Sequence, residues 1–339
     1  MVNNFYVGID LGTSRTSVSS STGKRFTIWT CVGYTKDVVA RKRFNREYLL
    51  GEEALDNRLS LNVIFPLAEG VIREDELSKR SIKLILEDAI KLAFPDLSSD
   101  DNIFAAIGAP AKASIENKKD IIKVSSNLFK KVIIVSEPFA VAYGMDRLDE
   151  CLICDIGAGT VDIMRMKGTI PEPDDQIMLT TAGNFLDKVL EEKILEKYPK
   201  VQLTPRIVRR VKEKYGYVSK NADTVSVEFT EEGKPNNYDL TDIIRESCME
   251  MANKICDSIK EMVSSFDPEF QAALRNNVII TGGGSRLVAI DRLVEEGLVP
   301  YGGGNATCVE EPEFAGSNGA LLMALEMPEE YWEELPNTN

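Results

Sequence analysis

A short turn pattern occurs twice in this chain, and it constrains the fold more than any other feature. An apolar segment over residues 4–9 ends in Asp10-Leu-Gly-Thr-Ser14, and a second one over residues 151–154 ends in Asp155-Ile-Gly-Ala-Gly-Thr160. Each turn continues into another strand-like stretch. The repeat predicts two halves of like topology, each opening with a β-hairpin.

The two turns have the composition of a polyphosphate site. Glycines let backbone N–H groups approach a phosphate closely, and Thr13, Ser14 and Thr160 add hydroxyl donors. Asp10 and Asp155 are anions, so each would hold Mg²⁺ through water or orient an attacking water. One such turn alone is an ordinary hairpin turn. Two of them at matching places of a repeat indicate a clamp on a polyphosphate from both sides.

Two further segments supply candidate nucleotide contacts. The cluster Gly282-Gly-Gly-Ser-Arg286 follows an apolar run and precedes a helix expected over residues 287–298, an arrangement that suits a nucleotide at a helix N-terminus. It lacks the lysine and the spacing of a Walker A loop. Glu137 lies between a strand expected over residues 132–135 and a helix expected over about 138–144. That place suits a helix-start carboxylate or a residue that positions water for attack on a γ-phosphate.

Missing residue types exclude several kinds of catalyst. The chain of 339 residues has no histidine, which excludes a Ser-His-Asp triad, a Cys-His dyad and the usual histidine-containing zinc sites. Phosphoryl transfer needs none of these, because positioning and a metal ion do most of the work. Cys151 and Cys154 have the spacing of a redox or zinc motif. In a buried strand they would point to opposite faces, so we interpret both as core residues.

The charge of the chain restricts its partners. A formal net charge of −14 opposes binding to nucleic acid or to an anionic membrane. Arg41, Lys42, Arg43 and Arg46 form a local basic cluster, which we interpret as a solvated loop. The apolar start is too short for a secretory signal, and no window reaches the roughly 18 apolar residues of a membrane span. We expect a cytoplasmic protein that neither contacts nucleic acid directly nor inserts into a membrane.

Taken together, the motifs resemble the superfamily of actins, sugar kinases and heat-shock chaperones. The segment Gly51-Glu-Glu-Ala54, followed by Pro66-Leu-Ala-Glu-Gly-Val-Ile72, and the segment Arg206-Ile-Val-Arg-Arg-Val-Lys-Glu-Lys214 narrow the resemblance to actins. The latter is similar to the actin helix that holds the ribose. Pro171-Glu-Pro-Asp-Asp-Gln176 and Ser265-Phe-Asp-Pro-Glu-Phe-Gln271 resemble the magnetosome filament actins of bacteria. The likeness covers essentially the whole chain.

The resemblance implies an α/β fold with two duplicated, ribonuclease H-like domains around a nucleotide cleft, each carrying a small insertion subdomain. Domain I would comprise residues 1–148 and 313–339, with an insertion at about 31–65. Domain II would comprise residues 149–312, with an insertion at about 187–250. The resemblance also implies hydrolysis of Mg-ATP to ADP and a homopolymeric cytoskeletal filament. Such filaments would lie alongside magnetosomes and be attached to them by magnetosome-associated adaptor proteins.

The same resemblance assigns roles to individual residues. Asp10 and Asp155 would serve the Mg²⁺ ion and its hydration shell, and Glu137 and Asp155 would position the hydrolytic water. The remaining residues would bind the nucleotide: Gly12, Thr13, Ser14, Gly157, Ala158 and Gly159 at the phosphates, Gly183 near the sugar–phosphate link, Lys212 and Glu213 beside the ribose and adenine, and Gly282, Gly283, Gly284 and Ser285 over the adenosine.

Two departures and two alternatives stay open. Ser17 stands where muscle-type actins have a phosphate-binding lysine, and Glu137 stands where they have glutamine. Whether Arg15 replaces that lysine is undecided by the sequence. An ATP-dependent kinase for a sugar or acetate would share the turns but form no polymer. A plasmid-segregating actin would polymerise and would reach DNA through an adaptor, so the acidic charge does not exclude it.

Overall fold

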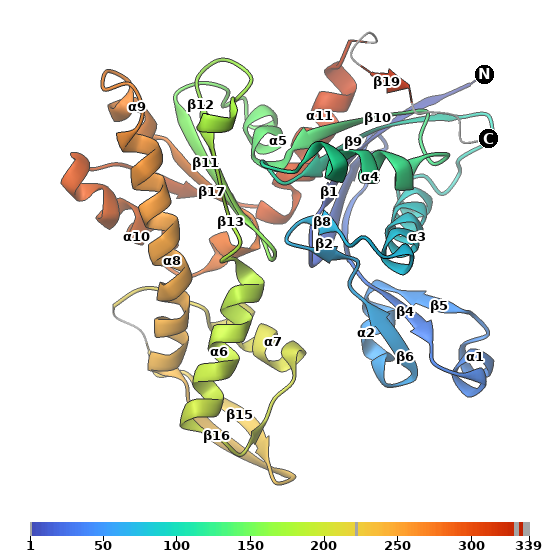
Figure 1. Ribbon diagram of the computed structural model, residues 1–339, viewed down its shortest axis with the longest axis horizontal. Coiled ribbons are helices and arrows are strands. Elements are labelled where there is room, and N and C mark those ends of the chain that lie inside the picture. Colours follow the sequence, from blue (N-terminus) through green and yellow to red (C-terminus); the bar gives the residue numbers. More distant parts are fainter. Residues whose placement is uncertain (1, 221–222, 329–331, 335–339) are drawn as a thin grey trace. The chain divides into compact units, whose positions relative to one another are not determined.

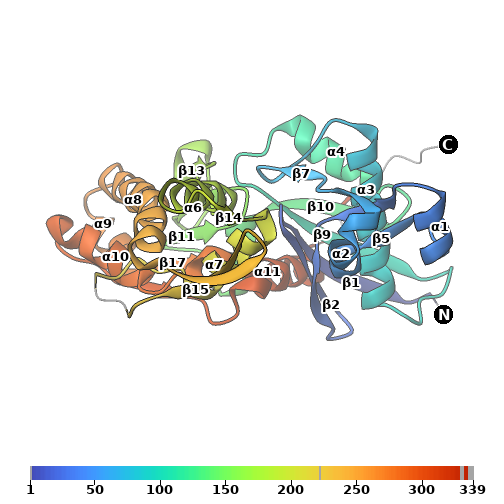
Figure 2. The ribbon, with the colours of Figure 1, turned by 90° about the horizontal axis from the view of Figure 1, so that it is seen from below.

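The computed structural model describes residues 2–220, 223–328 and 332–334. The chain divides into two units, which are shown from two sides in Figure 1 and Figure 2. Unit 1 is formed by Met1–Leu148 and Glu313–Asn339, and unit 2 by Asp149–Pro312. Each unit has a sheet and a hydrophobic core of its own. Among the described residues, no helix is both long enough and apolar enough to cross a bilayer.

Unit 1 is built on a six-stranded sheet. Its strands are β1 (Asn4–Leu11), β2 (Arg15–Ser20), β3 (Arg25–Trp29), β9 (Asn102–Ala109), β10 (Lys131–Ser136) and β19 (Glu333–Glu334), in the spatial order β19-β10-β9-β1-β2-β3. β1 pairs antiparallel with β2 and parallel with β9, and β9 pairs parallel with β10. The predicted hairpin is therefore present, and the parallel strands end at one edge of the sheet.

Helices cover both faces of this sheet (Figure 1). They are α3 (Glu76–Ala93) and α4 (Ile115–Ser125) on one face, and α5 (Glu137–Gly144) and α11 (Pro312–Glu326) on the other. The alternation along β1 places Val7, Ile9 and Leu11 in the core with α3 and α4. Gly8 faces α11, where a Cβ atom would lie 2.1 Å from the backbone oxygen of Ser317. A side chain at Gly8 would therefore push α11 off the sheet.

A small three-stranded sheet with its own core extends unit 1. It contains β4 (Val32–Thr35), β5 (Tyr48–Leu50) and β6 (Leu61–Ile64), with α1 (Val38–Phe44), α2 (Gly51–Asp56) and the 3-10 turn η1 (Arg58–Ser60). The basic cluster expected in a loop lies partly in a helix, since Arg41 to Arg43 belong to α1. The Asp37 carboxylate accepts the Val39 and Ala40 N–H groups at 2.9 Å and caps that helix. The hairpin of β7 (Leu67–Ala68) and β8 (Val71–Ile72) follows.

Unit 2 repeats the hairpin arrangement. Its five-stranded sheet contains β11 (Cys151–Ile156), β12 (Val161–Met166), β13 (Gln176–Leu179), β17 (Val278–Thr281) and β18 (Ala306–Cys308), in the order β13-β12-β11-β17-β18. β11 pairs antiparallel with β12 and parallel with β17. β11 thus has the same kinds of neighbour as β1, which explains why the two Asp-containing turns occupy equivalent places.

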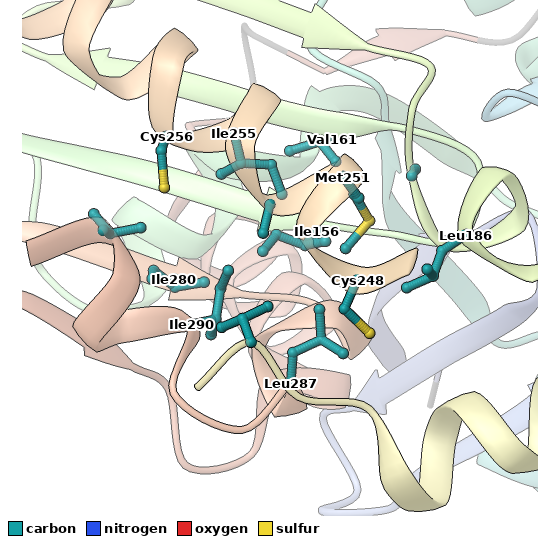
Figure 3. Packing of buried hydrophobic residues seen from close by; sticks show 14 of the residues in the cluster. Ile156, Val161, Leu186, Cys248, Met251, Ile255, Cys256, Ile280, Leu287 and Ile290 are labelled. Carbon is teal, nitrogen blue, oxygen red and sulfur yellow. The ribbon is translucent and has the colours of Figure 1, made fainter. Parts of the chain in front are cut away.

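The core of unit 2 packs helices against β11 and β17 (Figure 3). The helices of the unit are α6 (Gly183–Lys197), α7 (Pro205–Tyr215), α8 (Thr241–Ser264), α9 (Gln271–Asn276) and α10 (Ile290–Leu298). Cys248, Met251 and Ile255 recur at helical spacing on α8 and belong to one cluster with Ile156 and Ile280. Both cysteines of the C-x-x-C motif are buried free thiols, so they are core residues as predicted.

The helix expected over residues 287–298 begins later than predicted. A 3-10 turn, η3 (Gly283–Arg286), comes first, and α10 begins only at Ile290. Ala289 has a left-handed φ of 70°, which a continuous α-helix does not allow. The glycine cluster therefore leads into a tight turn instead of directly into the N-terminus of an α-helix.

Unit 2 also carries a small sheet of β14 (Val201–Gln202), β15 (Ser226–Glu231) and β16 (Lys234–Asp239). Glu232 and Gly233 both have positive φ, 49° and 80°, as a two-residue hairpin turn requires. Residues 187 and 250 lie inside α6 and α8. The part of this region with a sheet of its own therefore runs from Val201 to Asp239.

A buried ion pair connects β12 and the turn before β13 to α8. Arg165 on β12 donates to Asp175 Oδ1 at 2.9 and 3.1 Å and to the Met262 backbone oxygen at 3.0 Å. The two side chains are 8% and 2% exposed. Lys167 Nζ lies 2.9 Å from Asp175 Oδ2. Burial by itself would raise the pKa of Asp175, but the hydrogen bonds from Lys167, the Glu172 N–H and Arg165 lower it below its ordinary value.

Candidate functional site

The turn between β1 and β2 is held by two other segments of unit 1. Thr30 donates its hydroxyl to the Gly12 carbonyl at 2.7 Å and its N–H to the Ser14 carbonyl at 2.9 Å. The Gly70 N–H donates to Thr13 Oγ1 at 2.9 Å. A hydroxyl that accepts in this way keeps its own proton for another acceptor. The turn is therefore fixed in place while Thr13 retains a donor.

Asp10 and Glu137 lie at the same edge of the unit 1 sheet. Asp10 is near the end of β1, and Glu137 is the first residue of α5, directly after β10. Gly108 on β9 separates them, because a Cβ atom there would lie 3.2 Å from Glu137 Cγ and 3.6 Å from Asp10 Cα. Open α/β sheets bind ligands at the carboxyl ends of their parallel strands. The structure thus brings together the two carboxylates that the sequence predicted for one site.

The surroundings of Asp10 make its ionised form less favourable than it is in water. Burial raises the pKa of this carboxyl to about 6. The carboxylate lies against Gly316 of α11, where a Cβ atom would be 3.0 Å from Asp10 Oδ2. A cation close to this carboxylate would stabilise its ionised form and so offset the unfavourable effect of burial.

Arg15 and Ser17 differ in their environments. The Arg15 guanidinium lies over the Trp29 ring, 4.5 Å from its centroid, in a cation–π contact. Ser17 is 5% exposed and pairs with Asp10 across the β1–β2 ladder. The Arg15 side chain is therefore engaged at Trp29, and Ser17 has too short a side chain to replace a lysine.

In unit 2, the N-terminus of α6 holds the second turn. The Gly183 N–H donates to the Gly157 carbonyl at 3.1 Å, and the Asn184 N–H donates to the Ala158 carbonyl at 2.7 Å. A Cβ atom on Gly183 would lie 3.2 Å from Ala158 Cα. Gly183 therefore lets α6 approach the turn closely, and Gly159 completes the turn beside it.

Lys212 contacts the start of α6. Its ammonium donates to the Gly183 carbonyl at 2.8 Å and lies 2.7 Å from Asp187 Oδ1. Arg209, one turn earlier on α7, donates to Asp187 Oδ2 at 3.3 Å. The sequence reasoning missed Asp187 and Arg209, although the three-residue spacing of Arg209 and Lys212 places both on one face of a helix. Glu213 is exposed.

The glycine cluster packs beside Asp155. Gly282 has φ 74° and ψ 172°, and a Cβ atom there would lie 2.3 Å from Asp155 Oδ1. A Cβ atom on Gly284 would lie 2.1 Å from Ile156 Cγ2, whereas one on Gly283 would meet nothing within 4 Å. Ser285 donates its hydroxyl to the Gly282 carbonyl at 2.8 Å. Only Gly283 of the three glycines therefore borders open space.

Three buried hydroxyls near these turns have no hydrogen-bond partner among the described residues. They belong to Ser136, Thr181 and Thr281. Ser136 precedes Glu137, Thr181 precedes α6, and Thr281 is in register with Asp155. An unsatisfied buried hydroxyl costs roughly 1–3 kcal/mol, so such groups usually meet a ligand or water. No group of three or more Cys, Asp and Glu side chains that could hold a metal converges in the described ranges.

The candidate residues thus form two groups, one in each unit. The unit 1 group contains Asp10, Gly12, Thr13, Ser14 and Glu137. The unit 2 group contains Asp155, Gly157, Ala158, Gly159, Gly183, Lys212, Gly282, Gly283, Gly284 and Ser285. Both groups combine a carboxylate at a strand end with a hairpin turn of small residues, as a phosphate site with a hydrated metal ion requires.

Comparisons with known proteins identify the family of this chain. The family model described as MreB/Mbl protein matches residues 4–316. The chain belongs to the MreB/Mbl family. It is similar to the actin-like protein MamK of Paramagnetospirillum magneticum, with 42% identity over 336 residues that cover 98% of this chain and 96% of the relative. The actin-like fold predicted from the sequence is therefore confirmed.

Solved structures of MamK are also similar to this member of the MreB/Mbl family. A MamK double helical filament has a TM-score of 0.93 and 40% identity, covering 96% of this chain and 100% of that chain. A non-polymerising MamK mutant bound to AMPPNP has a TM-score of 0.74 and 39% identity, with the same coverage. The predicted resemblance to the magnetosome filament actins is confirmed, because MamK proteins are among the relatives of about 40% identity.

Proposed function

We propose that this MreB/Mbl family member is a bacterial actin that binds Mg-ATP, hydrolyses it to ADP and polymerises into a cytoskeletal filament. The observation that carries the proposal is the repeated site: Asp10 and Asp155 are each the last residue but one of a strand that has one antiparallel hairpin partner and one parallel neighbour. Filamentous and AMPPNP-bound relatives of about 40% identity support it.

The residues fit a nucleotide with a hydrated metal ion. Gly283 leaves room for a ligand, and the orphaned hydroxyls of Ser136 and Thr281 supply donors. The phosphates would be held by Gly12, Thr13, Ser14, Gly157, Ala158 and Gly159, the sugar by Gly183 and Lys212, and the adenosine by Gly282, Gly283, Gly284 and Ser285. Glu213, exposed on α7, would border the adenine. Asp10 and Asp155 would bind Mg²⁺ through its water shell, because Mg²⁺ keeps several waters in phosphate sites.

When bound, Mg²⁺ would neutralise charge that develops on the phosphate oxygens. Glu137 would accept a hydrogen bond from the attacking water and take its proton, and Asp155 would orient that water from unit 2. Glutamate can accept the proton outright, whereas the glutamine of eukaryotic actins can only orient the water. No covalent protein intermediate is needed.

Units 1 and 2 would then act as actin domains I and II. Their small sheets would be the insertion subdomains, the first within residues 31–65 and the second from Val201 to Asp239, inside the predicted range 187–250. Nucleotide contacted by both turns would favour a polymerising state, and phosphate loss would shift the population away from it. By similarity to MamK, the filament would lie in the cytoplasm alongside magnetosomes and bind adaptor proteins there.

High-speed sedimentation tests the proposal. The purified protein is incubated with Mg²⁺ and ATP, ADP or no nucleotide, and the pelleted protein and released phosphate are both measured. We expect nucleotide-dependent pelleting with slow phosphate release. Glu137→Ala should keep the pellet and lose phosphate release by about 10²-fold or more, while Glu116→Ala, an exposed residue of α4, should change neither. Protein that stays in the supernatant at high concentration under all conditions would refute the filament and favour a small-molecule kinase.

A further inference from the structure

A pocket lies in unit 1, apart from Asp10 and Glu137. It has a volume of about 520 Å³ and lies where the main sheet, α3 and the small sheet meet. Its walls are Arg15, Thr27, Ile28, Trp29, Leu50, Gly51, Glu52, Glu53, Ile85 and Asp88. Ligand pockets of roughly 300–1,000 Å³ are typical of small-molecule sites, and no residue assigned to the nucleotide lines this one.

The charged side chains of the pocket differ in their partners. The lining contains the carboxylates of Glu52, Glu53 and Asp88 and the guanidinium of Arg15, and both Glu52 and Arg15 interact with other groups of the protein. Glu53 forms an ion pair with Arg46, and Arg15 lies over Trp29. Asp88 is half-buried on α3, and within the described part of the chain its side chain has no ion pair or hydrogen bond. Burial raises the pKa of Asp88, and Lys91 on the same helix offsets only part of that rise.

Apolar side chains line the same pocket as Asp88. Ile85 precedes it by one turn on α3 and is 1% exposed, and Ile28 and Leu50 come from β3 and β5. A ligand that fills this space must therefore satisfy one carboxylate and also cover aliphatic surface. An ammonium group on a short alkyl stem does both, because the charged head pairs with the carboxylate and the stem leaves water.

The pocket is also joined to the phosphate turn. Arg15 directly follows Ser14, and Trp29 directly precedes Thr30, whose hydroxyl and N–H hold the Gly12 and Ser14 carbonyls. A ligand that packs against Trp29 therefore touches the strand end that fixes the turn. A shift of Arg15 or Trp29 on ligand binding would therefore be passed to Ser14 and Thr30, to which they are covalently joined.

We propose that this pocket is a second ligand site, which binds a small monovalent organic cation with an apolar stem at Asp88 and acts on the adjacent phosphate turn. The effect on the phosphate turn rests on the proposed nucleotide function, whereas binding of the cation in the pocket does not. The occupant is a small molecule of the alkylammonium type.

The site can be tested with Trp29 as the reporter. The chain has two tryptophans, so Trp332→Phe leaves Trp29 as the only one. The probe is n-butylammonium, compared with 1-butanol and butyrate at equal ionic strength and without nucleotide. We expect a saturable change in Trp29 fluorescence for the cation alone, in the millimolar range that so small a ligand allows. If 1-butanol or butyrate at equal concentration gives the same saturable change in Trp29 fluorescence, the pocket does not select a cation and the proposed site is refuted.

Matched variants on α3 test the role of the carboxylate. Asp88→Asn keeps the shape of the side chain and should weaken binding by about tenfold, because one charge-assisted contact is lost. Glu87→Gln, on the neighbouring position outside the pocket, should leave it unchanged. Far-UV circular dichroism verifies that both variants are folded. Equal affinities in the two variants would refute the assignment of Asp88.

A separate titration tests the link to the phosphate turn. AMPPNP affinity is measured with and without saturating n-butylammonium, and again in Asp88→Asn. We expect a change of at least about fivefold in the parent protein and none in the variant, which is the lower end of typical coupling energies between two sites. Unchanged AMPPNP affinity would refute the link to the phosphate turn. It would leave the binding site itself to be tested by the Trp29 titration. Failure of AMPPNP to bind at all would count against the proposed function and not against the pocket.

Discussion

Replacing Gly282 and Gly283 one at a time by alanine separates two roles within one glycine cluster. Gly282 has φ 74° and ψ 172°, a region that only glycine occupies readily, and an alanine there costs roughly 1–3 kcal/mol in backbone strain. Its Cβ atom would also lie 2.3 Å from Asp155 Oδ1 and 2.6 Å from the Ile156 carbonyl oxygen. Relieving such overpacking costs about another 1–3 kcal/mol.

The expected loss for Gly282→Ala is therefore about 2–6 kcal/mol of unfolding free energy. At Gly283, a Cβ atom would have no neighbouring atom within 4 Å, and the backbone φ is not positive. Gly283→Ala should stay within about 1 kcal/mol of the parent, on the stabilising side, because alanine restricts the unfolded chain.

Urea unfolding followed by far-UV circular dichroism measures both variants. Tryptophan fluorescence does not serve, because Trp29 and Trp332 both belong to unit 1 and Gly282 belongs to unit 2. With a slope of about 1–3 kcal/mol per molar urea, the unit 2 midpoint of Gly282→Ala should fall by about 1 M or more. Similar midpoints for the two variants would refute the packing argument. Because Asp155 must move, nucleotide affinity should fall in Gly282→Ala as well.

Two further predictions concern carboxylates. Asp10 has a pKa of about 6 in the folded chain against 3.8 ordinarily, so its ionised form destabilises the nucleotide-free fold as pH rises from about 4 to 6. Asp10→Asn should therefore raise the unfolding free energy at pH 7 by roughly 1–3 kcal/mol and weaken Mg-nucleotide binding. Urea melts at pH 7 and pH 4 verify this, and a stabilisation that persists at pH 4 would contradict it. Asp175 has a lowered pKa, so its contribution is present above pH about 4 and lost below. Asp175→Asn should destabilise by about 3–5 kcal/mol at pH 7, since Arg165 loses its buried partner. The gap between variant and parent should narrow on acidification, and a pH-independent gap would show that the charge pair is not its cause.

Local chemistry let the sequence predict much of the fold. The two hairpins follow from apolar strands interrupted by Asp and Gly, and β11, β12 and α5 lie where the residue pattern places them. The helix α7 lies where the resemblance to actins implied one. The family likeness follows from the same short motifs. These features depend on neighbours within a few residues, so periodicity and turn chemistry are sufficient to predict them.

Two helix boundaries differ from the prediction for different reasons. The start of α10 at Ile290 depends on the left-handed conformation of Ala289, which propensity does not determine. The helix at Arg41 begins after the Asp37 cap, a local signal of a helix start that the sequence interpretation did not use.

The sequence by itself determined that two Asp-containing turns of small residues occur at equivalent places in an actin-like chain. Only the tertiary structure decided what holds those turns: Thr30 and Gly70 in unit 1, and the start of α6 with Lys212 in unit 2. These partners lie far from the turns along the chain. Their contacts arise from strand pairing and helix packing, which no short window of sequence contains.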